Sequence, residues 1–215
     1  MKKLLAVAAS ICSMSVAAHA ADLAPVTMDT SQWFVHVGGA GVFFDPKITS
    51  ATGLIPGADA KINSNITGTI EVGHYFNKNI SVSLFAGIPP TTDIIGAGTA
   101  PALRAATVNY GSVILGAQYH FDTQSMFTPY VGGGAGYNIV LSTQPGPLLP
   151  GAKLDNSIGG VLQVGADFAV SDHVGLFVDV KKMFSTAHFS AAGGAVDGQL
   201  QLNPWIVSTG VSFSF

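Results

Sequence analysis

Two carboxylates in the C-terminal part of the chain come closest to a catalytic arrangement. Asp167 and Asp179 fall on the same side of two consecutive alternating segments, and Lys181 follows the second. Paired carboxylates could act as general acid and general base. No nucleophile or base motif accompanies them, so we favour a buried charge network in which Glu71, Asp167, Asp179 and Lys181 balance one another. We therefore predict that the protein is not an enzyme.

Other residue types that often carry chemistry are present but do not assemble a site. The glycine-rich stretch 131–136 lacks the Lys-Ser/Thr pair of a phosphate-binding loop. The histidines after residue 20 show neither helical i, i+4 spacing nor a cysteine partner; they are His36, His74, His120, His173 and His188. We predict neither a metal site nor a cofactor.

The first twenty residues have the pattern of a secretory signal peptide. A positive start at Lys2 and Lys3 precedes an apolar run that ends in a small-x-small site, and cleavage is expected between Ala20 and Ala21. The run is too short to span a bilayer as a helix. Cys12 lies inside it and follows Ile11 rather than a small residue, which argues against a lipoprotein. We predict a mature chain of residues 21–215 without cysteine.

Charge and hydropathy narrow the class of protein. Removing Lys2 and Lys3 from the nine basic residues leaves seven against twelve acidic ones, a net charge of −5, and no basic stripe that would bind nucleic acid. Charged residues make up only 10% of the chain, yet no mature stretch holds the roughly 20 continuous apolar residues of a spanning helix. A lipid-facing chain without helices must close a sheet on itself. The alternative is a soluble periplasmic β-protein.

The elements that position the charged residues are eight segments with a period of two. In the clearest of them Ile80, Val82 and Leu84 share one face, with Ser81 and Ser83 on the other. The eight segments are 33–44, 66–76, 80–88, 107–121, 129–141, 157–170, 174–184 and 204–215. The connections alternate between short turns and long loops, the loops being 45–65, 89–106, 142–156 and 185–203. This pattern predicts an all-β fold: an eight-stranded antiparallel transmembrane β-barrel with long extracellular loops and short periplasmic turns.

The same alternation sorts side chains into those that face lipid and those that face the lumen. Aromatic residues gather at the predicted periplasmic ends, as in an interfacial girdle; they are Trp33, Phe76, Tyr119, Phe121, Phe168, Phe213 and Phe215. The inward set is unexpectedly apolar and forms our candidate ligand path: Phe34, Val42, Phe44, Phe85, Ile114, Val161, Phe177, Met183 and Ile206. Small barrels also fill their interiors simply to pack, and a one-residue register shift would exchange the two faces.

Three segments resemble the outer-membrane protein W family. They are 79–89, similar to N-I-x-V-x-L-x-A-x-x-P; 129–138, similar to P-Y-V-G-x-G-x-x-Y; and 202–205, an L-x-P-W start to the last strand. The resemblance covers essentially the mature chain. It departs after Pro89, where only Asp93 matches the family's usual pattern, and at Ser214, where a basic residue is common. It implies an eight-stranded barrel in the bacterial outer membrane with an apolar lumen that passes small hydrophobic molecules.

The resemblance also implies partners. The strand ending at Phe215 is similar to the terminal strands that the outer-membrane barrel assembly machinery recognises. Outer-membrane lipid and lipopolysaccharide would surround the barrel, and Lys182 would reach head groups or lipopolysaccharide phosphate. Our first hypothesis is a passive channel for small hydrophobic or amphipathic solutes. The second is a structural or surface-interaction barrel with a plugged lumen that contacts host, phage or bacteriocin. A continuous apolar path favours the first, and a closed salt-bridged plug favours the second.

Overall fold

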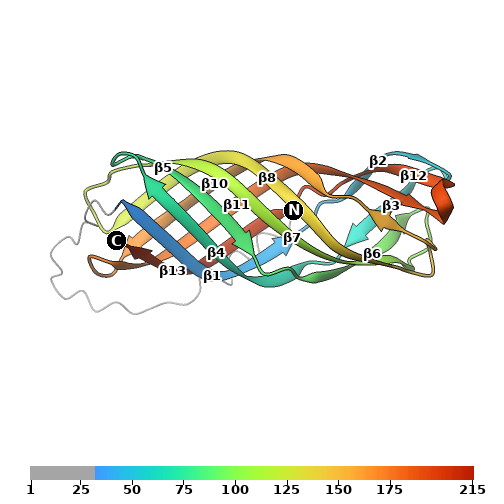
Figure 1. Cartoon of the computed structure of the whole chain (residues 1–215), viewed down its shortest axis with the longest axis horizontal. Helices are drawn as coiled ribbons and strands as arrows, with labels where there is room; N and C mark the ends of the chain where they lie inside the picture. The colour runs from blue at the N-terminus through green and yellow to red at the C-terminus, as the bar shows by residue number, and fades with distance from the viewer. Residues whose placement is uncertain (1–31) are drawn as a thin grey trace.

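The computed structural model describes residues 32–215, so the predicted signal peptide, with its cleavage site at Ala20 and Ala21, lies outside the described residues. Within them the chain is a long antiparallel β-barrel (Figure 1). Eight strands form the wall: β1 (Trp33–Phe43), β4 (Asn65–Tyr75), β5 (Ile80–Gly87), β7 (Arg104–His120), β8 (Phe127–Pro145), β10 (Ser157–Ala169), β11 (Val174–Ala191) and β13 (Trp205–Ser214).

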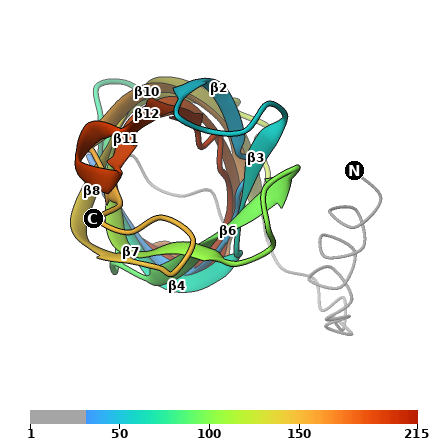
Figure 2. The same ribbon diagram turned by 90° about the vertical axis from the view of Figure 1, so that its right-hand side faces the viewer.

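The wall closes because the first and last strands pair. β1 runs antiparallel to β13 over ten residue pairs, from Phe34 opposite Ser214 to Phe43 opposite Trp205. Neighbouring strands follow around the ring in the order β1, β4, β5, β7, β8, β10, β11 and β13. Viewed along the axis, the strands form a closed ring (Figure 2). Closure leaves no free strand edge in the wall, which a lipid environment requires.

Tight turns join the strands at the end of the barrel that also holds both ends of the wall; we call it the short-turn end. In one turn the Asn77 side-chain oxygen accepts hydrogen bonds from the backbone N–H groups of Asn79 and Ile80, both at 2.9 Å. In another the Ser171 hydroxyl accepts one from the Val174 N–H at 3.2 Å. Side chains of this type stabilise turns by replacing a backbone acceptor. The turns at 77–79 and 171–173 are confirmed.

The opposite end, which we call the extended end, differs from the prediction. The segments predicted as long loops hold further strands: β2 (Lys47–Thr52), β3 (Ala58–Ile62), β6 (Thr91–Gly98), β9 (Lys153–Leu154) and β12 (Val196–Gln201). β7, β8 and β11 also run past their predicted ends. β12 pairs with β11 and β2, and β6 pairs with β7 and β3. Backbone pairing thus continues beyond the eight-stranded wall, because the same alternation persists through these segments.

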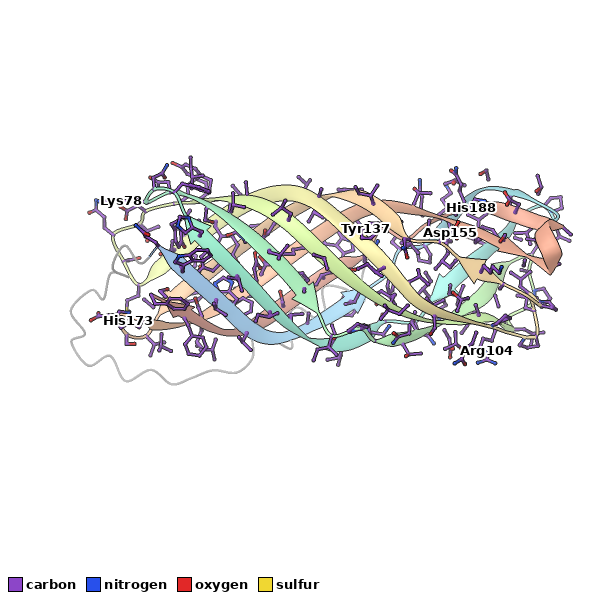
Figure 3. All side chains as sticks on the ribbon, in the orientation of Figure 1. Lys78, Arg104, Tyr137, Asp155, His173 and His188 are labelled. Atoms are coloured by element: carbon purple, nitrogen blue, oxygen red, sulfur yellow. The ribbon has the colours of Figure 1, made fainter. Side chains whose placement is uncertain are left out.

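The outer face of the wall is apolar, as the alternation predicted. Leu84, Leu115, Leu162, Val164 and Leu176 are all exposed along it. The predicted aromatic girdle is exposed as well, with Trp33, Phe76, Tyr119, Phe121, Phe168, Phe213 and Phe215 near the short-turn end. The sticks in Figure 3 show side chains around the whole wall, with His173 at the short-turn end and His188 at the extended end. Residues 32–215 contain no helix long and apolar enough to cross a bilayer.

Candidate functional site

The lumen is built of three layers that follow one another along the barrel axis. A polar cluster, which we call the plug, lies toward the short-turn end. An apolar layer comes next, and a second apolar cluster fills the extended end. The plug and the first apolar layer are formed by inward-facing side chains of the wall strands. Alternate residues of the same strands face lipid, because successive side chains of a strand point to opposite faces.

The centre of the plug is Lys181 on β11. Its ammonium nitrogen lies 2.8 Å from Glu71 Oε2 on β4 and 2.6 Å from Asp179 Oδ1 on its own strand. The three side chains are essentially inaccessible to solvent, each at 3% exposure or less. Removing charges from water costs several kcal/mol per ion, so such groups persist only when their partners are close and well oriented.

Neutral side chains satisfy the remaining oxygens of the two carboxylates. Glu71 Oε1 accepts hydrogen bonds from the Ser83 hydroxyl at 2.6 Å and from Gln118 Nε2 at 2.7 Å. Asp179 Oδ2 accepts hydrogen bonds from Gln163 Nε2 at 2.6 Å and the Tyr130 hydroxyl at 3.0 Å; these donors come from β10 and β8. The network therefore ties strands on several sides of the ring together across the lumen.

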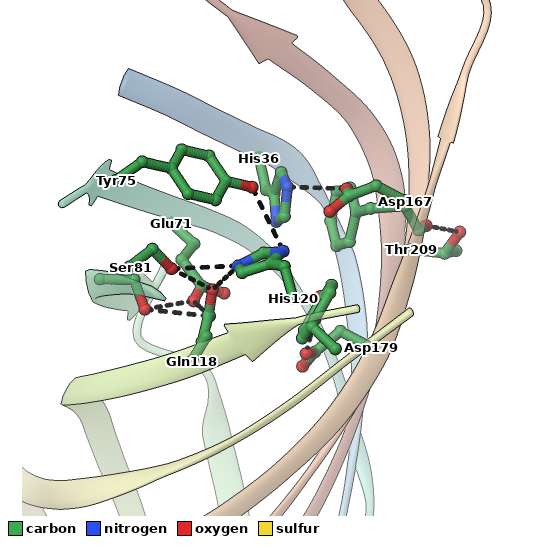
Figure 4. A network of polar contacts seen from close by, with 12 residues as sticks. His36, Glu71, Tyr75, Ser81, Gln118, His120, Asp167, Asp179 and Thr209 are labelled. Carbon is green, nitrogen blue, oxygen red and sulfur yellow. Dashed lines mark hydrogen bonds and ion pairs between the residues drawn. The ribbon is translucent and has the colours of Figure 1, made fainter. Parts of the chain in front are cut away.

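A group of histidine and aromatic side chains extends the plug toward the short-turn end (Figure 4). His36 Nε2 lies 3.0 Å from Asp167 Oδ1, and the His36 ring stacks on Phe177 with 4.4 Å between ring centres. His120 contacts the Ser81 hydroxyl at 3.0 Å and the Tyr75 hydroxyl at 3.2 Å. This packing leaves the lumen filled at this end. No cluster of three or more metal-ligating side chains occurs among residues 32–215.

The apolar layer follows the plug on the side of the extended end. It is a cluster of buried side chains with Phe44 packed on it, comprising Ala40, Val42, Phe85, Ile114, Val161, Met183 and Ile206. A cavity of about 50 Å³, which we call the inner cavity, lies against this layer and is lined by Val42, Phe85 and Ile206 among others. Its size admits a water-sized group rather than a whole organic molecule without side-chain movement.

A larger cavity of about 380 Å³ occupies the extended end; we call it the outer chamber. Its lining is almost entirely apolar and includes Leu54, Leu148, Leu149, Phe189 and Leu200. Ile94 and Leu154 line both cavities, so the two adjoin. The volume falls in the range of pockets that hold small organic ligands. The polar side chain of Asp59 is already occupied, because it accepts hydrogen bonds from the Ile48 and Ala60 N–H groups.

The wall beside the inner cavity contains an interruption. β5 pairs with β7 as far as Ala86 opposite Val113, and the ladder of β6 with β7 begins at Thr91 opposite Asn109. Between the two ladders the Tyr110 N–H donates to the Pro90 carbonyl at 3.2 Å. Pro89 and Pro90 lie in between, and proline has no N–H to donate to a ladder. Ile88, which is 69% exposed on the outer face, also lines the inner cavity. The inner cavity therefore lies directly against the wall at this position.

All nine predicted ligand-path residues point into the lumen, and they divide between layers. Phe34 and Phe177 lie in the plug, where they contact His36. The others belong to the apolar layer or pack on it; they are Val42, Phe44, Phe85, Ile114, Val161, Met183 and Ile206. Their role in carrying a solute stays a prediction.

The predicted charge network divides as well. Glu71, Asp179 and Lys181 are brought together, whereas Asp167 pairs with His36 instead of Lys181. Sequence analysis missed the contribution of His36, Gln118, His120, Gln163 and Tyr130 to the plug. Their inward direction could have been predicted, because each occupies an inward position of its strand. Their partners across the lumen could not, since these depend on how the strands are staggered.

The closed eight-stranded wall, its apolar outer face and its filled lumen define an outer-membrane β-barrel protein. The chain belongs to the OmpW family, whose model matches residues 30–215. It is 30% identical over 166 residues to the outer membrane protein AlkL of Ectopseudomonas oleovorans, covering 76% of this chain and 72% of AlkL. It is 26% identical to the dibenzothiophene metabolism operon protein PahQ of Pseudomonas aeruginosa, covering 89% of this chain and 92% of PahQ.

Solved structures show the same fold. The crystal structure of the outer membrane protein OprG from Pseudomonas aeruginosa superimposes with a TM-score of 0.74 at 20% identity, covering 86% of this chain and 96% of OprG. These matches place the chain in the bacterial outer membrane, as predicted. The matched family and its structural neighbours are outer-membrane barrels rather than enzymes.

Proposed function

We propose that this protein is a passive channel that admits small hydrophobic or amphipathic solutes through the outer membrane. The observation that carries the proposal is the position of the two cavities. The outer chamber and the inner cavity adjoin on the extended side of the plug, and Ile88, which lines the inner cavity, is exposed beside the wall interruption. A solute entering at the extended end would remain in apolar surroundings until it leaves sideways into the bilayer. Its own concentration gradient drives the movement, and no cofactor is needed.

The plug favours a route through the wall over a route along the whole axis. Lys181, Glu71 and Asp179 fill the lumen with buried, mutually satisfied polar groups. A hydrophobic solute passing them would leave these groups unpaired, which costs several kcal/mol. The interruption at Pro89 and Pro90 lies on the extended side of this barrier and offers an exit that avoids these buried charges.

The name of one relative supports the solute class. PahQ is named for a dibenzothiophene metabolism operon, and dibenzothiophene is an apolar sulfur heterocycle. A molecule of this chemistry matches the almost wholly apolar lining of the outer chamber. Small solutes with one polar function belong to the same class, because the chamber has few polar groups with which to exclude them.

The alternative function is a structural or surface-interaction barrel. The observation that favours it is the plug, which would be sufficient on its own to make the barrel rigid and impermeable along its axis. Contact with host, phage or bacteriocin would then involve the extended end. This alternative gives no role to an apolar chamber of about 380 Å³ or to a second cavity beside the wall interruption.

Uptake measurements separate the two functions. Liposomes with lipopolysaccharide in the outer leaflet would carry the purified protein, and entry of N-phenyl-1-naphthylamine would be followed by its fluorescence. We expect faster entry than in protein-free liposomes. Replacing Pro89 and Pro90 together by alanine restores two N–H donors, allows the wall to close and should slow entry several-fold. Pro129→Ala, at a proline inside the β8 ladder, is the matched control. Entry equal to the protein-free rate would exclude transport of this solute.

A further inference from the structure

We propose that the Tyr110 hydroxyl is a hydrogen-bonding site for the solute, which favours apolar molecules that carry one oxygen function over pure hydrocarbons. The inference rests on the proposed function and narrows its substrate class. It begins from an unusual feature of the lumen: the Tyr110 hydroxyl is buried and has no hydrogen-bond partner among the described residues. The Asn65 side chain lies near it, and no hydrogen bond of normal geometry joins the two.

The neighbouring polar side chains around the inner cavity are satisfied by the protein itself. The Thr92 hydroxyl donates to the Asn63 carbonyl at 2.9 Å, and the Ser112 hydroxyl donates to Asn138 Oδ1 at 2.6 Å. Thr67 donates to the Ile88 carbonyl at 2.5 Å. Buried polar groups are almost always paired in this way, and an unpaired hydroxyl carries a desolvation cost that a ligand could relieve.

Tyr110 also lies beside the proposed solute route. Its ring lines the inner cavity and packs edge-on against Phe44, with 5.6 Å between ring centres. Phe44 in turn contacts both the apolar layer and the apolar cluster of the extended end. Phe44 and Tyr110 both line the inner cavity, which adjoins the outer chamber. The backbone fixes this position, because the Tyr110 N–H donates to the Pro90 carbonyl at 3.2 Å.

The chemistry of the site defines the preferred solute. A phenolic hydroxyl both donates and accepts, so it suits a phenol, ketone, ester or ether oxygen. The hydroxyl groups named above are already paired, and the charged residue that lines the inner cavity, Asp155, already contacts His188 at 3.1 Å. The inner cavity therefore holds no free counter-ion for a charged carboxylate or ammonium group. The preferred solute is thus neutral and mostly hydrocarbon, with one oxygen placed to reach Tyr110 as the molecule leaves the chamber.

A matched pair of ligands tests the inference directly. 4-Fluorophenol and 4-fluorotoluene have similar shapes and differ in an OH against a CH₃ group. Their binding to the folded protein in detergent micelles would be measured by ¹⁹F NMR titration, with protein-free micelles subtracted. We expect 4-fluorophenol to bind more tightly relative to its micelle partition. Tyr110→Phe should reduce this preference by about 2- to 10-fold, the range of one neutral hydrogen bond, and leave 4-fluorotoluene unchanged.

Tyr119→Phe removes a hydroxyl from the exposed girdle and is the control; it should leave the binding ratio unchanged. Tyr110→Phe deletes an unpaired group, so the barrel should fold normally, which the electrophoretic mobility of unheated samples would show. If both ligands bind and Tyr110→Phe leaves their ratio unchanged, the inference is wrong while the proposed channel stands. If neither ligand binds the wild-type protein, the inference and the chamber's role in transport both fail.

Discussion

The ammonium nitrogen of Lys181 lies 4.5 Å from the centre of the Phe85 ring. On its other side the same nitrogen contacts Glu71 and Asp179. One side chain therefore forms the boundary between the plug and the apolar layer, and the ring of Phe85 covers the charge from the solute side. A cation over an aromatic face is attracted by about 0.5–2 kcal/mol, more when it is desolvated. The boundary thus presents an apolar surface to the inner cavity.

Lys181→Met should destabilise the barrel strongly. It leaves the Glu71 and Asp179 carboxylates buried without their counter-charge, a change that costs about 3–5 kcal/mol. Urea unfolding in lipid vesicles, followed by tryptophan fluorescence, would measure the loss. Lys182→Met is the matched control: Lys182 lies on the outer face and donates to the Asn203 carbonyl at 2.6 Å, so its loss should cost about 1 kcal/mol. Equal losses for the two variants would contradict the central role of Lys181.

The sequence was sufficient to predict the wall because barrel strands impose a period of two. From Ile80 to Ile88 the sorting of side chains into lipid and lumen faces needs no knowledge of the neighbours. The strands of the extended end were missed because they are short and interrupted by residues such as Pro46, Pro56 and Gly57. Their pairing is set by distant partners, for example Ala58 opposite Gly98, which local patterns do not reveal.

The contents of the lumen were predictable only as a set. The alternation of the sequence predicts that Asp167 and Lys181 both face the lumen. Which groups they contact there depends on the stagger of the strands around the ring. Asp167 meets His36 from β1, and Lys181 meets Glu71 from β4. The two cavities were likewise beyond sequence analysis, since they depend on how the extended strands enclose the lumen.

Gly165→Ala should destabilise the barrel, whereas Gly160→Ala on the same strand should not. A Cβ at Gly165 would lie 2.4 Å from the Tyr130 ring, which is fully buried and donates a hydrogen bond to Asp179. Moving the ring would break that bond, and overpacking of this kind costs about 1–3 kcal/mol. A Cβ at Gly160 meets no atom within 4 Å. The unfolding midpoints in urea would compare the variants; similar midpoints would mean that Tyr130 adjusts freely.

The extended end should be more stable in mild acid than in mild alkali. His188 Nε2 lies 2.9 Å from Asp197 and its Nδ1 lies 3.1 Å from Asp155. Hydrogen bonds to Asp197 and then Asp155 raise the pKa of His188. The folded state therefore holds the proton more tightly than the unfolded chain, whose histidine pKa is about 6.5. The stabilisation is fully present below that value and is lost as the pH rises through the folded pKa.

Hydrogen exchange measures this change. The amides of β12, corrected for their intrinsic rates, should be better protected at low than at high pH, and His188→Gln should remove the difference. His173→Gln, at the exposed turn on the opposite end, is the control. Because all three side chains are exposed, the effect should weaken with added salt. Unchanged protection of β12 across the pH range would show that the His188 contacts do not stabilise this end.

Phe215→Ala separates assembly from stability. The backbone of Phe215 helps to close the barrel. Its N–H donates to the Trp33 carbonyl, and its own carbonyl accepts from the Trp33 N–H, both at 3.0 Å. Its side chain is 65% exposed and contributes little to that closure. Refolding into vesicles should therefore stay within about 0.5 kcal/mol of the wild-type stability. If the predicted assembly signal operates, the amount in the outer membrane of cells should fall while Phe213→Ala, two residues earlier on the same face, has a smaller effect. A normal cellular amount would exclude the signal, and a matching loss in vitro would assign the residue to stability instead.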